Sequence, residues 1–493
     1  MPSITVQRTQ HRLLPDPRRV LAKPFLLGEE LLLPGPSRAR LLMERILAIP
    51  APQASELLAQ ILETFSSRHR DYQDLLERHF QLVAHHIDST EALARERRLL
   101  IGACFTHEYS VESAALFNPS LVAAPNQAGL AAGAVRLVMS LRAVGEGHLS
   151  SIQFRSAVID ASGELTFDPL GSHLAGGRRT PPERYQKRLF MDKLAELGAA
   201  NELAFAVLEP LPEWFTPAGL EASLLAFEEH GPPHAIWFET VKIIRVLASS
   251  SYVTTFPADS AIDERVIFPA GPNETRGMED ARFVRFSDDD GQAKYYATYT
   301  AYDGFEIFPQ LIETDDFITF AISTLNGSAA QNKGMALFPR RIGGLHLMLS
   351  RKDRENLYLA TSSDIHFWND ATELYRPHEP WELLQIGNCG SPLETEAGWL
   401  VLTHGVGPMR RYTIGALLLD LEDPSRVVGR LREPLLVPEA SEREGYVPNV
   451  VYSCGGLIHG DRLVLPYGIA DAAVGIAVVP LPELLAELHA TGP

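Results

Sequence analysis

Two adjacent carboxylates, Glu279 and Asp280, lie in the stretch ETRGMEDARFVRF, which covers residues 274–286. Arg276 and Arg282 flank the pair, and the alternating run that follows predicts a β-strand. A carboxylate pair between arginines at the junction of a loop and a strand can perform acid/base chemistry. It can also be an ion-pair network that holds a turn, because short motifs of this kind are common. The segment alone leaves both interpretations open, so the elements around it must be considered.

The charge of the chain limits its partners. Its 493 residues have room for two or three domains, or for one large β architecture with additions. The 44 basic and 62 acidic residues give a formal net charge of −18, which argues against nucleic acid and against an anionic membrane surface as partners. A small anionic substrate is still compatible with this charge, because a cleft can have a local potential of the opposite sign.

Cysteine usage and hydropathy indicate the compartment. The three cysteines, Cys104, Cys389 and Cys454, show no CxxC spacing, which predicts a reducing environment and no structural zinc. No His/carboxylate spacing supports another metal site, so we expect none. The start of the chain has no continuous apolar run, and no stretch of roughly 18 apolar residues occurs later. We therefore expect a cytoplasmic protein without a signal peptide and without a membrane partner.

The sequence pattern divides the chain into regions. Residues 1–105 combine a proline-rich start with apolar residues at helical spacing, which predicts an extended and helical N-terminal region. Residues 106–482 are mostly of β type. At about residues 178–249 a polar stretch followed by helical patterns interrupts them, which we interpret as a helical insertion. Residues 483–493 predict a C-terminal helix and tail. Within the insertion, helices are expected at about Glu183–Leu197, Pro217–Glu229 and Trp237–Ser249.

A repeated strand pattern runs through the β-type region. Five short apolar runs, interpreted as inner strands, can be aligned, and their fifth positions are Arg142, Thr300, Arg351, His404 and Tyr467. The last four runs recur at intervals of roughly 50 to 65 residues, which is typical of β-propeller blades. We therefore predict a mainly β fold, a five-bladed β-propeller with the helical insertion between its first two blades. The alternatives are a sandwich, which seldom repeats at this interval, and a β-helix.

The repeat also predicts a pocket. Equivalent positions in a propeller lie at equivalent depth around its axis, so the five fifth positions should point to one central pocket. Three of these residues, Arg142, Arg351 and His404, can be cationic, and their guest should therefore be an anion. The alternative is that each cation pairs with a carboxylate of its own blade.

Several separated motifs resemble one family. The stretches are GMEDARF at 277–283, YYATYTAYDG at 295–304, NKGMALFPRRIGGLHLMLSR at 332–351, GSPLETEAGWLVLTHGV at 390–406, GYVPNVVYSCGG at 445–456 and YGIADAAVGIA at 467–477. In this order they resemble the β-mannoside phosphorylases of glycoside hydrolase family 130. The resemblance runs from about His107 to Val479 and is broken by the helical insertion. The helical N-terminal region and the segments FNPS and RAVGEGH resemble the longer β-1,2-oligomannan phosphorylases of that family.

The resemblance implies a reaction and a set of site residues. These enzymes cleave a β-mannoside with inorganic phosphate as co-substrate and without a cofactor, and they invert the anomeric carbon to give α-mannose 1-phosphate. The active site lies in the axial funnel of a five-bladed propeller. The catalytic acid falls on Asp280, which in the family acts through a hydroxyl of the bound mannose. Mannose-binding positions fall on Asn118, Arg142 and Asp471, and phosphate-binding positions fall on Lys333, Arg351, His404 and Tyr412.

This chain departs from the family pattern at two positions. Ala281 stands where the family usually has proline, so a fixed φ is lost. Gly334 stands where an aspartate commonly follows the phosphate-site lysine. The acid and Arg282 are retained, but the fine positioning of the site is open.

The chemistry of the residues agrees with phosphorolysis. Inverting hydrolysis needs an acid and also a base that activates water, whereas phosphate is already a nucleophile and needs cations to hold it. One carboxylate with Lys333, Arg351 and His404 fits phosphorolysis, and the partners are then a β-mannooligosaccharide and phosphate. The alternatives are a β-mannosidase of the same fold and a non-catalytic sugar-binding propeller. The helical regions are candidates for a homo-oligomer interface.

Overall fold

The computed structural model describes residues 4–27, 37–87, 93–230, 235–289 and 291–492. Within these residues the protein is mainly β, which confirms the predicted class. Five antiparallel sheets of four to six strands make up most of it. None of the helices in the described ranges is both long and apolar enough to span a membrane.

The first two sheets are connected through the helical insertion. The first has the strand order β12–β6–β5–β4, with β7 added to β6, and the second has the order β13–β14–β15–β16–β11–β8. The first sheet consists of β4 (Ala115–Ala123), β5 (Val135–Val144), β6 (Ser150–Ile159), β7 (Leu165–Phe167) and β12 (Val266–Ile267). The second consists of β8 (Arg178–Thr180), β11 (Tyr252–Thr255), β13 (Met278–Ser287), β14 (Ala293–Tyr302), β15 (Ile307–Thr314) and β16 (Thr319–Thr324). Because β11 and β12 follow the insertion and join different sheets, the chain ties the two sheets together.

The remaining three sheets follow in sequence order. Their strand orders are β17–β18–β19–β20, then β21–β23–β24–β25 with β22 on β23, then β1–β29–β28–β26 with β27 on β28. The third sheet consists of β17 (Ala336–Leu337), β18 (His346–Ser350), β19 (Leu357–Ser362) and β20 (Asp370–Tyr375). The fourth consists of β21 (Gln385–Asn388), β22 (Leu393–Thr395), β23 (Gly398–Gly407), β24 (Arg411–Leu419) and β25 (Val427–Arg430). The fifth consists of β1 (Gln7–Leu13), β26 (Val451–Tyr452), β27 (Leu457–His459), β28 (Arg462–Ile469) and β29 (Ala473–Pro480), and α9 (Leu481–Thr491) ends the chain against β25.

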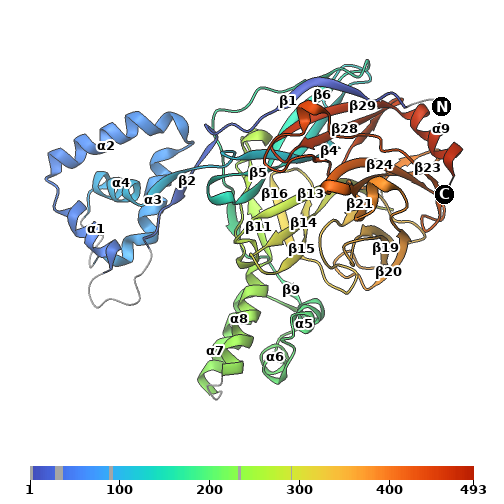
Figure 1. The fold of residues 1–493 in the computed structure, drawn as a ribbon. Helices are drawn as coiled ribbons and strands as arrows, with labels where there is room; N and C mark the ends of the chain where they lie inside the picture. Colours follow the sequence, from blue (N-terminus) through green and yellow to red (C-terminus); the bar gives the residue numbers. More distant parts are fainter. Residues whose placement is uncertain (1–3, 28–36, 88–92, 231–234, 290, 493) are drawn as a thin grey trace.

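The five sheets form a closed ring (Figure 1). Each sheet packs against the next, and the fifth packs against the first, through the strand contacts β4–β13, β14–β17, β18–β21, β24–β26 and β28–β4. Apolar side chains fill the spaces between neighbouring sheets. For example, Leu402 of the fourth sheet and Leu465 of the fifth belong to one buried cluster, and Leu349 of the third sheet shares another with Val401 of the fourth. Burial of these faces is the main force that holds the ring together.

The five aligned runs lie in equivalent strands, but not in the inner ones. They fall in β5, β14, β18, β23 and β28, each of which is second in its sheet. The interpretation as inner strands is therefore wrong. The first strands, β4, β13, β17, β21 and β26, are harder to recognise, because β17 and β26 have two residues each and β4 and β13 contain register shifts.

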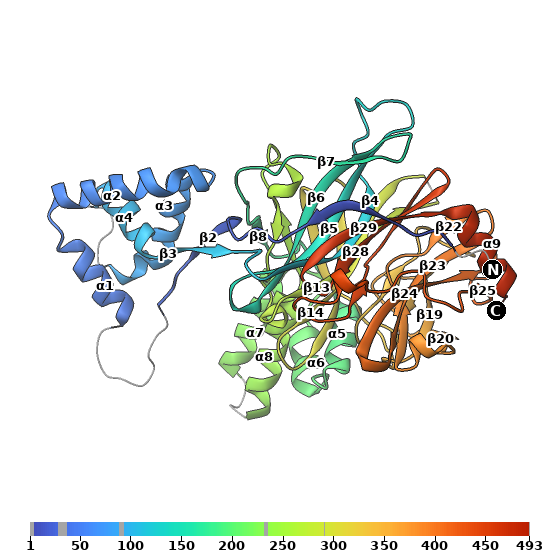
Figure 2. The ribbon, with the colours of Figure 1, turned by 45° about the horizontal axis from the view of Figure 1, so that its top comes forward.

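The start of the chain contributes to two structures. β1 pairs with β29 and completes the fifth sheet, so residues 7–13 belong to the ring although the sequence analysis assigns residues 1–105 to a separate region. β2 and β3 pair with each other and carry a group of helices away from the ring (Figure 2). These elements are β2 (Val20–Pro24), α1 (Arg38–Leu47), α2 (Ala51–Phe65), α3 (Tyr72–Val83), α4 (Arg95–Cys104) and β3 (Thr106–Ser110).

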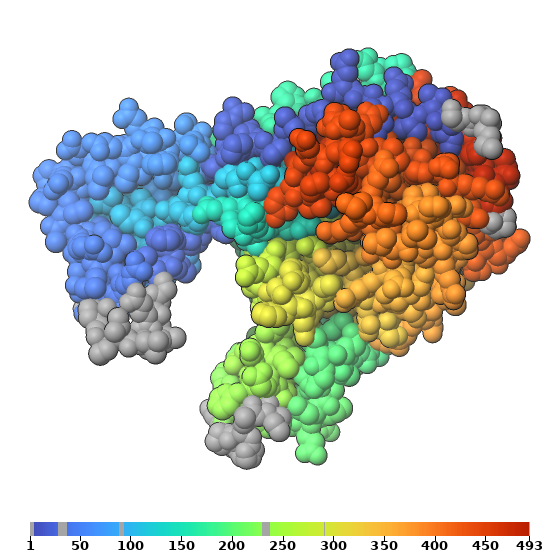
Figure 3. Space-filling model, viewed as in Figure 1, coloured from blue at the N-terminus to red at the C-terminus, as the bar shows by residue number. Residues whose placement is uncertain are grey.

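The helical insertion lies between β8 and β11 in sequence and has a core of its own. Its elements are β9 (Tyr185–Gln186), α5 (Lys187–Glu196), α6 (Glu202–Leu208), β10 (Trp214–Phe215), α7 (Pro217–His230) and α8 (Ala235–Ser249). Leu194, Val207, Leu220 and Ile244 are buried together between the helices. The sequence analysis does not expect α6, because seven residues are too few for a periodic pattern. Figure 3 shows the insertion and the N-terminal helices as two arms with an open gap between them.

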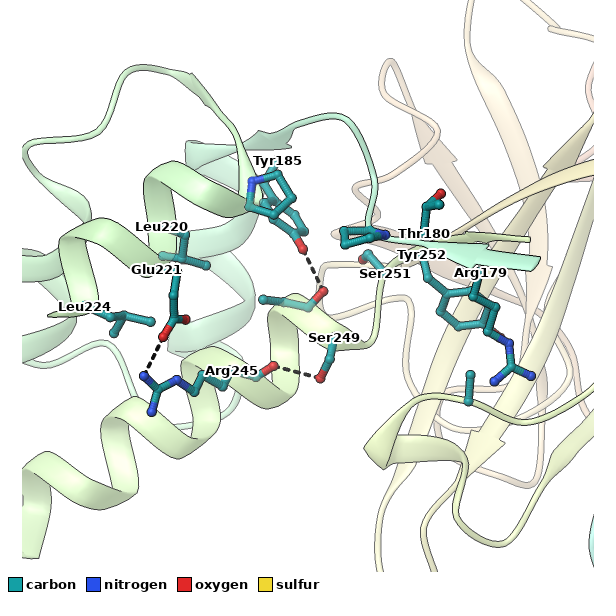
Figure 4. A pocket seen from close by; sticks show the side chains of 14 residues that line it. Arg179, Thr180, Tyr185, Leu220, Glu221, Leu224, Arg245, Ser249, Ser251 and Tyr252 are labelled. Atoms are coloured by element: carbon teal, nitrogen blue, oxygen red, sulfur yellow. Dashed lines mark hydrogen bonds and ion pairs between the residues drawn. The ribbon is translucent and has the colours of Figure 1, made fainter. Parts of the chain in front are cut away.

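Figure 4 shows the side of the insertion formed by α7 and α8. The Tyr185 hydroxyl donates a 2.9 Å hydrogen bond to the carbonyl of Ala248, and Arg245 of α8 pairs with Glu221 of α7 at 2.7 Å. A cavity of about 350 Å³ separates these helices from Tyr252 of the second sheet. This side of the insertion therefore faces the ring across a cavity.

Candidate active site

A cavity of about 210 Å³ lies where the five sheets meet. The eight residues that the sequence analysis assigns to the site all line it; they are Asn118, Arg142, Asp280, Lys333, Arg351, His404, Tyr412 and Asp471. They come from β4, β5 and β13, from the loop before β17, from the residue that follows β18, from β23 and β24, and from the turn between β28 and β29. Every sheet thus contributes at least one side chain to a single cavity.

Asn118 and Asp280 interrupt their strands in the same way. The pairing of β4 with β5 and that of β13 with β14 both shift register at these residues. Both backbones are left-handed, with φ of 49° and 59°, a conformation that Asn and Asp adopt more readily than other non-glycine residues. Such bulges redirect side chains, and here they bring the two together: the Asn118 amide donates a 2.7 Å hydrogen bond to Oδ1 of Asp280.

The charges around Asp280 favour its ionised form. Burial works to raise the pKa of this carboxyl, but Arg142, Arg282, the Asn118 amide and Lys333 outweigh it, so the pKa lies below its ordinary value. Nη1 of Arg142 lies 3.4 Å from Oδ1 of Asp280. In the protein without substrate, Asp280 is therefore a carboxylate that needs a change in its surroundings before it can donate a proton.

Glu279 joins two cations of the cavity. Its Oε1 accepts a 2.9 Å hydrogen bond from Nη2 of Arg142, and its Oε2 pairs with Nζ of Lys333. The next residue after Lys333 is also held, because the side-chain amide of Asn388 donates to the carbonyl of Gly334. These contacts hold Lys333 in the cavity from two directions.

Asp471 is a carboxyl of the cavity whose pKa is raised. It lies with Ala470 in the turn between β28 and β29, and both have left-handed backbones. Burial and the negative charge of Asp280 raise its pKa to about 7, although Arg142 and Arg410 act in the opposite direction. Near neutral pH, Asp471 can therefore donate or accept a hydrogen bond from a sugar hydroxyl.

Arg351 and His404 form a pair in which only the arginine is charged. Nδ1 of His404 lies 3.1 Å from the carbonyl of Asn388, which assigns the ring proton to Nδ1. Nε2 then accepts the 3.0 Å hydrogen bond from Nη1 of Arg351. Burial, Arg351 and Arg282 lower the pKa of His404 well below its ordinary value. His404 therefore positions Arg351 as a neutral base, which corrects the expectation that it supplies positive charge.

The chain is similar in sequence to several phosphorylases. A 1,2-β-oligomannan phosphorylase from Thermoanaerobacter sp. (strain X514) is 34% identical over 235 residues, which cover 45% of this chain and 75% of the relative. The chain belongs to glycoside hydrolase family 130. Residues 257–489 match the family described as β-1,4-mannooligosaccharide phosphorylase.

Two further proteins are similar to this chain. A β-1,2-mannobiose phosphorylase from Listeria innocua is 33% identical over 237 residues, which cover 46% of this chain and 65% of the relative. A solved structure of a β-1,2-mannobiose phosphorylase from Listeria innocua with β-1,2-mannobiose covers 78% of this chain and 93% of its own, at 24% identity and a TM-score of 0.46.

Two of the five repeat-equivalent residues do not line the cavity of this family 130 protein, which corrects the prediction that all five converge. Thr300 is buried opposite Glu279 in the pairing of β13 with β14, and of these two residues only Glu279 lines the cavity. The Tyr467 hydroxyl donates a 2.6 Å hydrogen bond to Oε1 of Glu442. Its ring lies over Gly475 of the next strand, where there is no side chain to block it.

The sequence analysis also missed residues of the cavity. Gln385, Arg410 and Tyr452 line it, together with Glu279, which was considered only as half of a carboxylate pair. Tyr452 accepts a hydrogen bond from the buried Arg282. Its position two residues before Cys454 in a family motif was the only signal available. Among the described residues, no group of three or more His, Cys, Asp or Glu side chains could hold a metal ion, and the absence of a metal from the reaction stays a prediction.

Proposed function

We propose that this chain is an inverting β-mannoside phosphorylase that transfers a mannosyl group from a β-1,2-linked mannooligosaccharide to inorganic phosphate. The observation that carries the proposal is that the guanidinium of Arg351 has no carboxylate partner. This guanidinium is largely buried beside the cavity, and no carboxylate of the described residues lies within 4 Å of it. An unpaired buried cation is costly. An anion that enters the cavity and pairs with Arg351 removes that cost.

Phosphate is the anion that best fits these surroundings. Lys333 and Tyr412 line the same cavity as Arg351, so an ammonium and a hydroxyl can donate to the anion as well. Arg142 is less available, because both Glu279 and Asp280 already pair with it. We assign phosphate to Lys333, Arg351, His404 and Tyr412, with His404 acting through Arg351.

The sugar belongs on the other side of the cavity. We assign the mannose to Asn118, Arg142 and Asp471, whose amide, guanidinium and carboxyl groups suit hydroxyl groups. Asp280 then lies between sugar and phosphate as the catalytic acid, and it passes its proton to the leaving oxygen through a mannose hydroxyl. In this proposal the ring of sheets is a five-bladed propeller, its funnel holds the site, and the helices 187–249 are an insertion between the first two blades.

Binding of phosphate can itself raise the pKa of Asp280. The cations that lower the pKa of Asp280 include Lys333, and an anion bound to that lysine weakens its effect on the carboxyl. In the reaction, a phosphate oxygen bonds to the anomeric carbon and the glycosidic C–O bond breaks. The leaving alcohol gains one proton, and monohydrogen phosphate loses one, so the protons balance. No general base is needed.

The choice of linkage rests on the relatives. The oligomannan and mannobiose phosphorylases named above are described as acting on β-1,2 linkages, whereas a β-1,4-mannooligosaccharide phosphorylase from Ruminococcus albus is 32% identical over 184 residues, which cover 35% of this chain and 55% of that relative. The longer matched segment favours β-1,2-linked substrates.

One experiment separates the proposal from its rivals. The protein is incubated with β-1,2-mannobiose or β-1,4-mannobiose, with and without phosphate, and α-mannose 1-phosphate is followed by phosphorus NMR. We expect product only from the β-1,2 sugar with phosphate present. Free mannose formed without phosphate identifies a β-mannosidase instead.

A variant tests the third possibility, a non-catalytic sugar-binding protein. Asp280→Asn should reduce turnover by about 10²- to 10⁴-fold while circular dichroism shows an intact fold. If the wild-type protein binds mannobiose but neither phosphate nor this substitution changes the amount of sugar consumed, the protein is a binding module and the proposal fails.

A further inference from the structure

A second cavity, of about 250 Å³, lies between the helical insertion and the outer strands of the second sheet. It is slightly larger than the active-site cavity. The insertion contributes α5 and the β9–β10 pair, and the ring contributes β11, β15 and β16. Figure 1 shows α5 and β9 next to this part of the ring. Because β16 and β11 are three and four strands away from β13, the cavity is about 15–20 Å from Asp280. It is therefore separate from the active site.

Both walls of the cavity are fixed to each other. Oε1 of Glu196 in α5 accepts a 2.6 Å hydrogen bond from the backbone amide of Gly327, which follows the second sheet. Arg188, also in α5, pairs with Asp364 at 3.0 Å. These contacts hold the helix against the ring at two places, so the cavity is part of the folded structure.

The charged residues that line this cavity are paired. Lys193 pairs with Glu196, Glu313 pairs with Lys294 at 2.7 Å and with His366 at 3.5 Å, and Arg184 lies 3.6 Å from Glu183. Every charged lining residue that the structure describes thus has a partner of opposite sign. The active site differs in this respect, because Arg351 lacks such a partner. The second cavity therefore suits an uncharged ligand.

The uncharged lining groups are mostly apolar, and a few polar side chains lie among them. Trp214 is 55% exposed at the cavity, and the pairing of β10 with β9 places it opposite Gln186. The Ser323 hydroxyl lies 3.4 Å from Nδ1 of His366 on the opposite wall. An exposed indole ring offers a flat apolar surface, and amide, hydroxyl and imidazole groups donate and accept hydrogen bonds. A few polar groups around an aromatic surface are typical of a small-molecule site.

We propose that this cavity is a second carbohydrate-binding site, which holds a neutral β-mannooligosaccharide away from the catalytic cavity. The indole of Trp214 packs against the apolar face of one sugar ring, and Gln186 and Ser323 hydrogen-bond to its hydroxyls. The choice of a mannoside rests on the function proposed above; the cavity itself indicates an uncharged ligand with an apolar face and a few polar groups. A site of this kind keeps a long substrate attached between successive cleavages.

Calorimetry with β-1,2-mannotriose in phosphate-free buffer tests the proposal on the full chain. Without phosphate the active site binds sugar but cannot turn it over. Arg142→Ala weakens the active site, so the second site can be measured in that background. We expect the wild-type protein to bind two molecules and the Arg142→Ala protein to bind one.

The decisive variant is Trp214→Ala in the Arg142→Ala background, which should weaken the remaining site by about tenfold or more. Phe205→Ala is the matched control, because Phe205 is an aromatic residue of the same insertion with 54% exposure and lies outside the cavity; it should leave binding unchanged. Ser323→Phe fills the cavity from the other wall and should also abolish binding, which guards against a misfolded Trp214 variant.

The outcomes distinguish this proposal from the proposed function. If the wild-type protein binds one mannotriose and Arg142→Ala binds none, the second site does not exist, while the active site is unaffected as a hypothesis. If the protein with Arg142→Ala binds mannotriose equally well with and without Trp214, the site is elsewhere and the assignment is wrong. If no form of the protein binds mannotriose, both proposals fail.

Discussion

The side-chain amide of Asn118 donates a 2.7 Å hydrogen bond to Oδ1 of Asp280, and both residues have left-handed backbones. The bond joins the first sheet of the ring to the second. It also favours the ionised form of Asp280, since it contributes to the lowered pKa of that carboxyl. The position of the proposed acid thus depends on two bulges that lie in different sheets.

Replacement of Asn118 by glycine removes this bond without straining the backbone, because glycine adopts positive φ easily. We expect kcat/KM for the mannoside to fall by about 10- to 100-fold, since one hydrogen bond to a charged group is lost. The thermal midpoint should stay near that of the wild type. Steady-state kinetics and calorimetric unfolding measure the two quantities.

Asn118→Ala serves as the control for backbone strain. It loses the same bond but must also place an alanine at φ of 49°, which costs about 1–2 kcal/mol of stability. Equal kinetic defects with different midpoints support the assignment. Wild-type kcat/KM in Asn118→Gly contradicts it.

Arg351→Ala tests the phosphate assignment. Removal of the guanidinium leaves Lys333 as the main cation available to the anion, and we expect KM for phosphate to rise at least about tenfold while KM for the sugar changes less than about threefold. Initial rates at varied phosphate and fixed sugar, and the converse, separate the two. Arg376→Ala, which removes an arginine exposed on the outside of the ring and paired with Glu373, should change neither. A rise in the sugar KM alone places the phosphate elsewhere.

His404 tests whether neutral imidazole is sufficient. Nε2 accepts the hydrogen bond from Arg351, and the pKa of the ring is well below its ordinary value because of burial and the neighbouring arginines. We expect the imidazole carbons of His404 to show no titration in NMR spectra between pH 5.5 and 8. His404→Gln, which keeps an acceptor, should raise the phosphate KM less than His404→Ala does.

An imidazole that titrates near pH 6.5 contradicts this interpretation. In that case His404 is a cation over part of the working range, and the phosphate KM of the wild type should increase as the pH rises through that value. The two outcomes are distinguishable on the same protein.

The sequence predicted the composition of the site better than its electrostatics. Arg142, Arg351 and His404 occupy equivalent positions of a repeat, and that pattern correctly brings them to one cavity. Their charge states were not predictable, because they depend on partners from other sheets. Arg142 pairs with Glu279 and Asp280 from the neighbouring sheet, and not with a carboxylate of its own blade as the alternative expects.

The failures at Thr300 and Tyr467 have a physical cause. Both occupy the same repeat position as Arg142, but side chains at equivalent backbone positions do not always line the same cavity. Thr300 is buried opposite Glu279, which lines the cavity in its place, and the ring of Tyr467 lies over Gly475 while its hydroxyl donates to Glu442. The role of β1 was unpredictable for a similar reason, since its partner β29 lies at the other end of the chain.

The last prediction concerns Asp471, whose pKa in the folded protein is raised to about 7 from an ordinary value of 3.8. The folded protein therefore keeps this proton over a range of pH in which the unfolded chain has lost it. The stability that results is fully present below pH 4, decreases as the pH rises from about 4 to 7, and is absent above that range. In Asp471→Asn the side chain cannot ionise, so this loss does not occur.

We expect the free energy of unfolding of Asp471→Asn, relative to the wild type, to increase by about 1–3 kcal/mol between pH 4.5 and pH 8.5, with a discount for the partial exposure of the group. Urea unfolding of both proteins at the two pH values measures this difference in free energy. Groups that titrate alike in the two proteins contribute equally to both, so they do not affect the difference.

The charges that set the shift in the pKa of Asp471 are Asp280, Arg142, Arg410 and Glu279. Asp280→Asn removes the negative charge that acts most strongly on Asp471, so the same difference measured in that background should become smaller. A difference that is constant with pH means that Asp471 ionises normally in the folded protein, and then it faces the sugar as a permanent carboxylate.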